Sequence, residues 1–152
     1  MPYQTRGKFF EDFSVGDETI SQGRTITETD VVNFAAFSGD WTQLHTDVEY
    51  ARSTQFGERI SHGLLGLAVM SGLLAGLGLV EGTVIAFTGL DWKFKAPIKL
   101  GDTIHAAIRV KQKKEMKAAG GGFVILEARV LNQREEVTQQ GDLNLLIKSR
   151  GE

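Results

Sequence analysis

The hydrophobic pattern of the chain changes near its middle. In the second half, apolar and polar residues alternate with a period of two, which is typical of β-strands with one buried face. The expected strands are residues 85–96, 104–111, 124–130 and 137–147. Segments rich in glycine, aspartate and asparagine separate them, so neighbouring antiparallel strands are predicted.

Helical periodicity marks the first half. Apolar residues within 31–37 recur at helical spacing, and the helix is expected to stop at Gly39. Thr27 is a candidate N-cap, and Asp30 three residues later is an acidic variant of the capping box. Asp47 is a candidate cap of a short helix through Tyr50 and Ala51. Residues 18–25 have modest β character and predict a first strand.

A second helix is expected from about Gly63 to Leu77. Residues 63–80 contain no charged side chain, and Gly72 and Gly76 form a GxxxG pair, so a membrane span is one alternative. Five glycines dilute its hydrophobicity, however. An apolar helix in a small protein is more simply a fully buried one. Early helices and late antiparallel strands predict an α+β domain covering residues 1–152.

The overall composition indicates which binding partners and which cellular compartment to expect. The chain has 152 residues and a net charge of −2, with no basic stripe for a nucleic acid. The lysines at 111, 113, 114 and 117 are expected in a solvated loop rather than in a phosphate-binding patch. Absence of cysteine excludes disulfides, and residues 1–10 lack a secretory signal. A cytoplasmic protein without a membrane partner is expected.

Asp40 and His45 lie five residues apart, just after the first helix. An aspartate there is often only a turn residue that satisfies its own backbone amides. The functional alternative is an acid–base pair that shares one water. A metal site with His62 has none of the HxH, HExxH or facial-triad spacings, so neither a metal nor another cofactor is expected.

A second polar group of residues opens the apolar helix. Free amides at a helix N-terminus favour negative charge, so the Gly63 amide is a candidate oxyanion donor. Gly63 could equally pack against a strand, and His62 could be a cap or contact substrate. Ser71, eight residues after Gly63, either bonds to its own helix or orients the Asp–His pair. GxSxG, GxGxxG and P-loop motifs are absent.

Several stretches together resemble the MaoC-like dehydratases, a family that includes the (R)-specific enoyl-CoA hydratases. The stretches are Phe37-Ser38-Gly39-Asp40-x-x-x-Leu44-His45-x-Asp47, Phe10-Glu11-Asp12-Phe13-x-Val15-Gly16-Asp17, Ile60-Ser61-His62-Gly63, Ser71-Gly72-Leu73-Leu74 and Phe94-Lys95-Ala96-Pro97. They occur in family order and cover nearly the whole chain.

The resemblance implies a hot-dog fold, in which an antiparallel sheet wraps around one long central helix. It also implies a homodimer, or an assembly of dimers, that binds an acyl-CoA thioester at the dimer interface. By position, Asp40 and His45 match the catalytic carboxylate and imidazole, and Gly63 matches the amide that binds the thioester carbonyl. Ser71 matches the serine that helps to fix the pair.

One departure from the family motif concerns the loop itself. Thr42-Gln43 stands where the motif has Asn-Pro, and Thr42 supplies fewer hydrogen bonds than an amide side chain. Hydration of an enoyl-CoA, as in fatty acid metabolism, is the preferred function. A hot-dog thioesterase and a non-catalytic acyl-CoA binding module are the alternatives.

Residues for the rest of the substrate are less defined by the sequence. Lys93 and Lys95 share one face of a strand and are candidates for the CoA phosphates. Apolar residues that serve either as core or as the lining of an acyl tunnel are Phe56, Leu64, Leu67, Met70 and Trp92.

Overall fold

A computed structural model describes residues 3–151 of the chain. Its helices are α1 (Glu28–Ser38), α2 (Gln43–Thr46), α3 (Val48–Arg52) and α4 (Gly63–Gly76), with short 3-10 turns at Phe10–Asp12 and Lys117–Ala119. Its strands are β1 (Glu18–Ile20), β2 (Arg24–Thr25), β3 (Val84–Phe94), β4 (Thr103–Met116), β5 (Gly121–Leu131) and β6 (Val137–Lys148).

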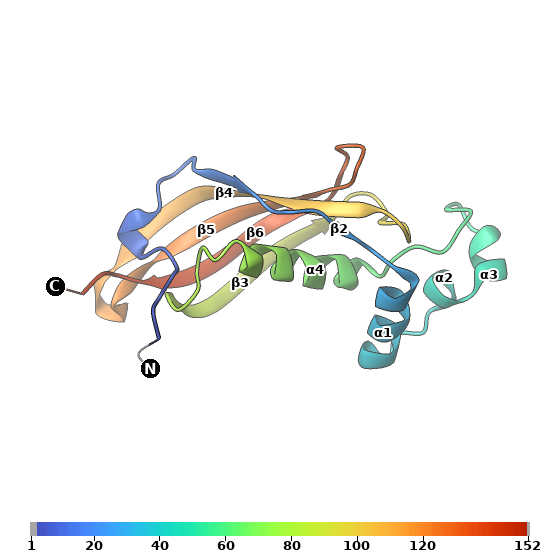
Figure 1. The fold of residues 1–152 in the computed structure, drawn as a ribbon, viewed down its shortest axis with the longest axis horizontal. Helices are drawn as coiled ribbons and strands as arrows, with labels where there is room; N and C mark the ends of the chain where they lie inside the picture. The colour runs from blue at the N-terminus through green and yellow to red at the C-terminus, as the bar shows by residue number, and fades with distance from the viewer. Residues whose placement is uncertain (1–2, 152) are drawn as a thin grey trace.

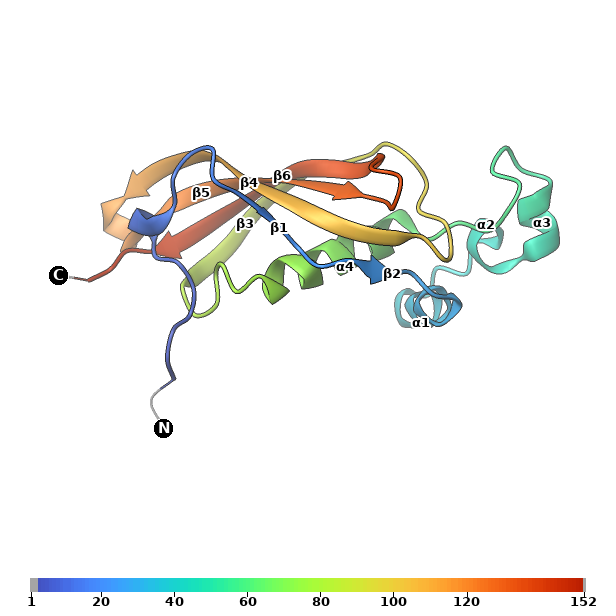
Figure 2. The same ribbon diagram turned by 45° about the horizontal axis from the view of Figure 1, so that its top comes forward.

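The strands form one antiparallel sheet that curves over α4. Its order is β1-β4-β5-β6-β3, and β2 pairs with β4 beyond the end of β1. Figures 1 and 2 show α4 lying along the sheet, with α1, α2 and α3 gathered beyond its N-terminal end. The expected α+β class, with a sheet wrapped around a central helix, is confirmed.

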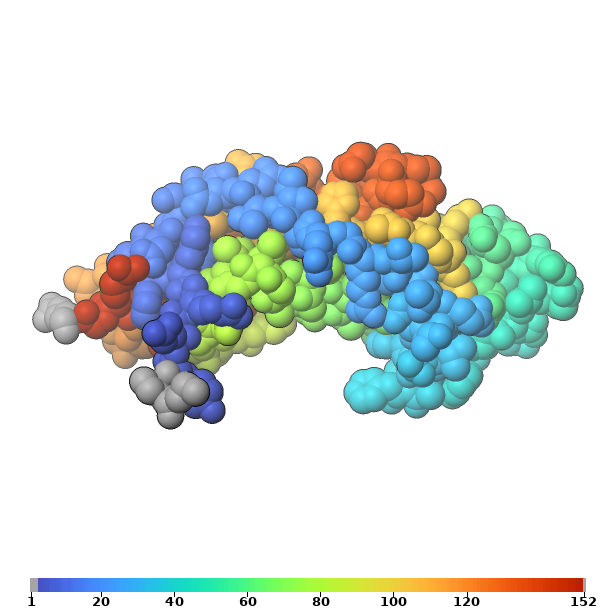
Figure 3. Space-filling model, viewed as in Figure 1, coloured from blue at the N-terminus to red at the C-terminus, as the bar shows by residue number. Residues whose placement is uncertain are grey.

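The core lies between the sheet and one face of α4. The buried residues of this face are Leu65, Gly66, Val69, Met70, Leu73 and Leu74. Inward-facing residues of β4, β5 and β6 pack against them. The expectation of a fully buried helix was wrong for the single chain, because the sheet covers only one side of α4. Figure 3 shows part of the other side exposed between the N-terminal segment and α1.

The strand nearest the N-terminus is shorter than expected. Residues 18–25 form β1 and β2 rather than one strand. Between them, Ser21 interrupts the regular hydrogen-bond ladder with β4. Its main-chain N–H donates to the Ala106 carbonyl, but its hydroxyl, not a main-chain carbonyl, accepts from the Ala106 N–H, both at 2.9 Å. The chain therefore stays attached to β4 through a side chain.

Most of the lysine-rich segment is part of a strand, not a loop, and only Lys117 lies beyond it, in the following 3-10 turn. β4 continues to Met116 because it pairs with β5 up to the turn at Gly120, whose φ of 70° suits glycine. Lys111 donates to the Asp142 carboxylate at 2.6 Å, and Lys113 donates to the Phe13 carbonyl at 2.6 Å.

Among the described residues, no helix has both the length and the apolar character that crossing a bilayer requires.

Helix ends were predicted well. Thr27 caps α1, with its hydroxyl accepting from the Asp30 N–H at 3.2 Å and the Asp30 carboxylate accepting from the Thr27 N–H at 2.9 Å. Gly39 ends the helix in the left-handed region, at φ 77°. The Asp47 side chain caps α3 by accepting from Tyr50 N–H at 2.9 Å. These caps define both ends of the segment that carries Asp40 and His45.

Replacing Thr27 by alanine is expected to lower the free energy of unfolding by about 1 kcal/mol, because one N-terminal amide of α1 loses its acceptor. Urea denaturation of the two proteins measures the difference. Thr27→Ser is the control, since it keeps the hydroxyl and should stay close to wild type. Equal losses in both variants would contradict the capping role.

Candidate active site

The Asp40 carboxylate is oriented by Thr42. Oδ1 accepts from the Thr42 hydroxyl at 2.5 Å and from the Thr42 N–H at 3.1 Å. These two bonds, with smaller contributions from His62 and His45, hold the pKa of the exposed Asp40 carboxyl below its ordinary value. The Thr42 side chain supplies one of these bonds, and its main-chain amide supplies the other. Asp40 is therefore kept as an ionised acceptor.

His45 lies on the short helix α2, not in the loop expected after the first helix. Its Nδ1 is 2.8 Å from the Ile60 main-chain carbonyl oxygen. A carbonyl oxygen only accepts, so Nδ1 carries the proton. In the neutral ring, Nε2 then has a free lone pair, which is the state that a general base requires.

His62 is the N-cap residue of α4 by position, as one of its two expected roles requires, but its side chain is turned elsewhere. It is 2% exposed, and its side chain makes no capping hydrogen bond to α4. Instead Nε2 lies 2.9 Å from the Asp40 main-chain carbonyl oxygen, and the ring stacks on His45 with centroids 4.0 Å apart. The side chain therefore neither bonds to the first turn of α4 nor lines the apolar pocket described below.

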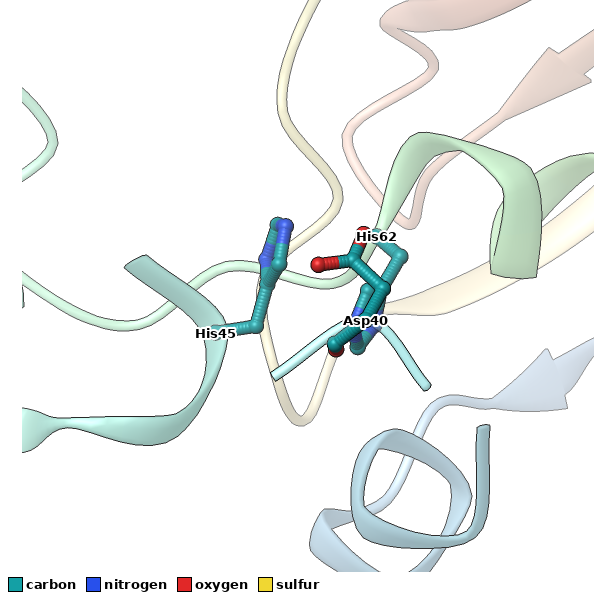
Figure 4. Close-up of side chains that lie close together, drawn as sticks. All are labelled: Asp40, His45 and His62. Atoms are coloured by element: carbon teal, nitrogen blue, oxygen red, sulfur yellow. The ribbon is translucent and has the colours of Figure 1, made fainter. Parts of the chain in front are cut away.

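These three side chains converge (Figure 4). One carboxylate oxygen of Asp40 and one ring nitrogen of each histidine lie within 4.8 Å of one another. Two hydrogen bonds of about 2.8 Å each to a shared water span up to roughly 5.6 Å. The separation of Asp40 from His45 therefore suits one water held by both.

The same atoms are the only cluster of potential metal ligands within residues 3–151. The two imidazole planes are inclined by only 31° at a centroid distance of 4.0 Å, so their in-plane lone pairs do not meet at one point. The expected absence of a metal stays a prediction.

An apolar pocket of about 670 Å³ adjoins His45 and the N-terminus of α4. Its lining is His45, Phe56, Ile60, Ser61, Gly63, Leu64, Phe94, Lys95, Ala96, Pro97, Ile98 and Gln139. The volume is within the range of small-ligand sites. Gly63 is the first residue of α4, so its N–H has no acceptor within the helix. Asp40 is outside this lining, and its exposed carboxylate is free to hold water.

Gln139 is a site residue that the sequence analysis missed. It is 2% exposed, its Nε2 donates to the Gly63 carbonyl at 2.9 Å, and its Oε1 accepts from Trp92 Nε1 at 3.0 Å. The alternation of β6 was a usable signal, since Gln139 lies in phase with the buried residues Leu143 and Leu145. A glutamine at an inward-facing position needs polar partners.

The other residues that the sequence predicted for the site lie partly in the apolar pocket and partly elsewhere in the structure. The Ser71 hydroxyl donates to Ala68 O within α4 at 2.6 Å and is exposed, so the structure does not bring it to the Asp–His pair. Lys93 and Lys95 share a second groove of about 220 Å³, and Lys95 also lines the apolar pocket. Of the tunnel candidates, Phe56 and Leu64 line this pocket, whereas Leu67, Met70 and Trp92 belong to the core.

Comparison with known proteins agrees with this arrangement. The family model described as "MaoC like domain" matches residues 13–127, which include the Asp40–His45 segment, α4 and most of the sheet. The chain belongs to the MaoC-like dehydratase family. The resemblance read from the motifs is confirmed.

Individual MaoC-like relatives cover this chain to different extents. It is 39% identical over 107 residues to protein MaoC of Klebsiella aerogenes, covering 70% of this chain and 31% of that protein. It is 35% identical over 102 residues to the (R)-specific enoyl-CoA hydratase of Rhodospirillum rubrum, covering 67% of this chain and 69% of that one. The chain thus spans less than a third of the Klebsiella protein's length.

Among solved structures, the monoamine oxidase regulatory protein from Archaeoglobus fulgius superposes with a TM-score of 0.89. The two chains are 35% identical, and the match covers 95% of this chain and 97% of that one. The expected hot-dog architecture of MaoC-like proteins is thereby confirmed for this chain.

Thr42→Val is expected to raise the pKa of the Asp40 carboxyl towards its ordinary value, because the hydroxyl donor is lost. The ionised form contributes stability above the unfolded-state pKa and loses it as pH falls through the folded-state pKa. In the variant, protonation of Asp40 therefore begins at a higher pH. Titration of the Asp40 carboxyl ¹³C resonance measures this shift.

Thr46→Val is the matched control for Thr42→Val. The Thr46 hydroxyl donates to the carbonyls of Trp41 and Thr42 and does not contact the Asp40 carboxylate. An unchanged pKa in Thr42→Val, or an equal rise in the control, would argue against direct stabilisation by Thr42.

Proposed function

We propose that this chain is a hydro-lyase that reversibly hydrates an enoyl-CoA, or a related acyl thioester, to the β-hydroxyacyl thioester. The observation that carries the proposal is that an ionised carboxylate and a free imidazole nitrogen converge beside an apolar pocket. The imidazole lines this pocket together with Gly63, whose helix-terminal amide is unpaired within the helix. Relatives named as (R)-specific enoyl-CoA hydratase and hydroxybutyryl-CoA dehydratase support the same reaction class.

In this mechanism Asp40 and His45 Nε2 hold one water between them. The water oxygen attacks the β carbon, and the proton that it loses passes to the pair. The electrons of the double bond move towards the thioester carbonyl, which becomes an enolate oxygen. The α carbon then takes a proton from the pair, so water is added with no net loss or gain of protons. Dehydration follows the same steps in reverse.

The Gly63 amide stabilises the enolate oxygen. It is the first N–H of α4, where free amides and the helix dipole both favour negative charge. Gln139 binds the carbonyl on the other side of the same residue at 2.9 Å, which limits rotation of this part of the chain. Because the donor is preorganised, little rearrangement is needed as charge develops.

The two grooves suggest where the rest of the substrate lies. The acyl chain fits the apolar pocket beside Phe56 and Leu64. Lys95 borders both this pocket and the groove that contains Lys93, so a CoA leaving the pocket along Lys95 reaches a second lysine. We assign the CoA phosphates to this pair.

Asp40→Asn and His45→Ala are each expected to lower kcat for hydration by a factor on the order of 10² or more, because each removes a proton acceptor from the water. The measurement is the loss of enone absorbance over a panel of enoyl-CoA chain lengths. Matched thermal unfolding curves show whether each variant is folded.

The same panel separates the alternatives. Near-wild-type hydration by either folded variant would contradict the assignment of the pair. Free CoA released from saturated acyl-CoA, detected with a thiol reagent, would instead indicate a thioesterase. Enoyl-CoA that binds at every chain length without being hydrated would indicate a binding module.

We also propose that two copies pair through β3 and the open face of α4. β3 is at one end of the sheet order, and the exposed apolar residues on it are Val84, Ile85, Phe87, Leu90 and Phe94. The exposed positions of α4 are Leu64, Ala68, Ser71, Gly72, Ala75 and Gly76, none of them charged. A second copy would cover both surfaces and extend the sheet across the dimer.

Phe87→Glu is expected to raise the dimer dissociation constant by about tenfold or more, because it buries an unpaired charge in the interface. Sedimentation velocity over a concentration series measures it. Val15→Glu, which alters a 62% exposed apolar residue away from β3 and α4, should leave the constant unchanged. A monomeric wild type, or equal effects in both variants, would refute this interface.

A further inference from the structure

His62 contacts each part of the site through a different group. Its ring Nε2 binds the Asp40 main-chain carbonyl at 2.9 Å, and its ring stacks on His45 at 4.0 Å. Its main chain is the N-cap of α4, directly before the Gly63 amide. Phe34 of α1 packs against the ring at a centroid distance of 4.9 Å. One buried residue therefore joins the acid and the base, through its ring, to the oxyanion donor, through its main chain.

The orientation of His62 separates it from direct chemistry. Its neighbours Ser61 and Gly63 line the apolar pocket, whereas His62 does not. It is 2% exposed and turned towards the Asp40 main chain. A group in this position does not reach a substrate in the pocket, so any effect on the reaction passes through the residues that it contacts.

The hydrogen bonding of His62 argues against simple packing. Asp40 O only accepts, so Nε2 carries the ring proton. Nδ1 is then an acceptor, and it is buried without a hydrogen-bond partner among the described residues. A buried acceptor without a partner is costly, and an apolar ring would avoid that cost. The polar function of this side chain is concentrated in the single bond to Asp40.

We propose that His62 is a positioning residue that sets the distance from the Asp40–His45 pair to the Gly63 amide. The inference rests on the proposed hydration, in which one water and one carbonyl oxygen must be held together. Thr42 aims the Asp40 side chain but is part of the same loop, so it does not fix that loop relative to α4. The Nε2–H of His62 does so, because it ties the Asp40 main chain to the residue before Gly63.

Glutamine and methionine variants isolate this hydrogen bond. The two side chains have similar length and both lack the stacked ring, but only glutamine has an N–H in the place of Nε2. His62→Gln is expected to keep kcat within roughly threefold to tenfold of wild type. His62→Met is expected to lose kcat by a factor on the order of 10², with KM for the enoyl-CoA unchanged, because misplacement by about 1 Å has that effect.

Three outcomes would overturn the proposal: equal kcat in the Gln and Met variants, a change confined to KM, or wild-type kcat in His62→Met. If His62→Met does not fold, His62→Phe replaces it, since phenylalanine keeps a ring against His45 without the N–H. The kcat of His62→Phe is then compared with that of His62→Gln, and the same outcomes support or overturn the proposal.

A spectroscopic measurement separates this proposal from the proposed reaction. Imidazole ¹⁵N chemical shifts report which ring nitrogen carries the proton, whatever the protein catalyses. We expect a proton on Nε2 of His62, and a proton on Nδ1 alone would overturn the tether. A wild-type protein with the Nε2 proton but no hydration of any thioester would refute the proposed function and leave the geometry intact.

Discussion

The close approach of α4 to the sheet is the constraint on which the rest of the site depends. Gly66 permits it, because a Cβ there would lie 2.3 Å from Gln139 Nε2 and 2.7 Å from Ile98 Cδ1. At that separation Gln139 of β6 reaches the Gly63 carbonyl, and the first turn of α4 is anchored to the sheet. The position of the free Gly63 amide thus follows from how closely an uncharged helix packs.

Asp40 and His45 are attached to this frame mainly through main-chain carbonyls. His45 bonds to Ile60 O, which lies just before α4, and His62 bonds to Asp40 O. A carbonyl acceptor specifies where a ring proton sits, so these contacts orient the imidazoles and select their tautomers together. Farther out, the Arg59 guanidinium pairs with Glu28 and links the first turn of α1 to the same segment. The first turn of α1 and the segment before α4 are therefore tied together, and Asp40 lies between them in the chain.

Sequence patterns predicted the elements whose cause is local. Thr27 with Asp30, Gly39, and Asp47 mark helix ends through bonds to nearby amides, and these were located correctly. Patterns were less informative where the cause is distant. The break at Ser21 depends on a side-chain bond to β4, and the open face of α4 depends on how much of it one sheet covers. Neither is encoded in the spacing of apolar residues near the element concerned.

The same distinction explains what could be predicted of the site and what could not. Asp40, His45 and Gly63 could be predicted as site residues because a family motif records residue identity at those positions, and their roles stay predictions. The bond from His62 to Asp40 ends on a main-chain oxygen, which every residue has, so the sequence of the loop carries no mark of it. This also bears on Thr42-Gln43, where the motif has Asn-Pro. The Trp41 and Thr42 carbonyls accept from Thr46, and the Asp40 carbonyl accepts from His62. Much of the hydrogen bonding that fixes the main chain of the loop therefore does not depend on the side chains at positions 42 and 43.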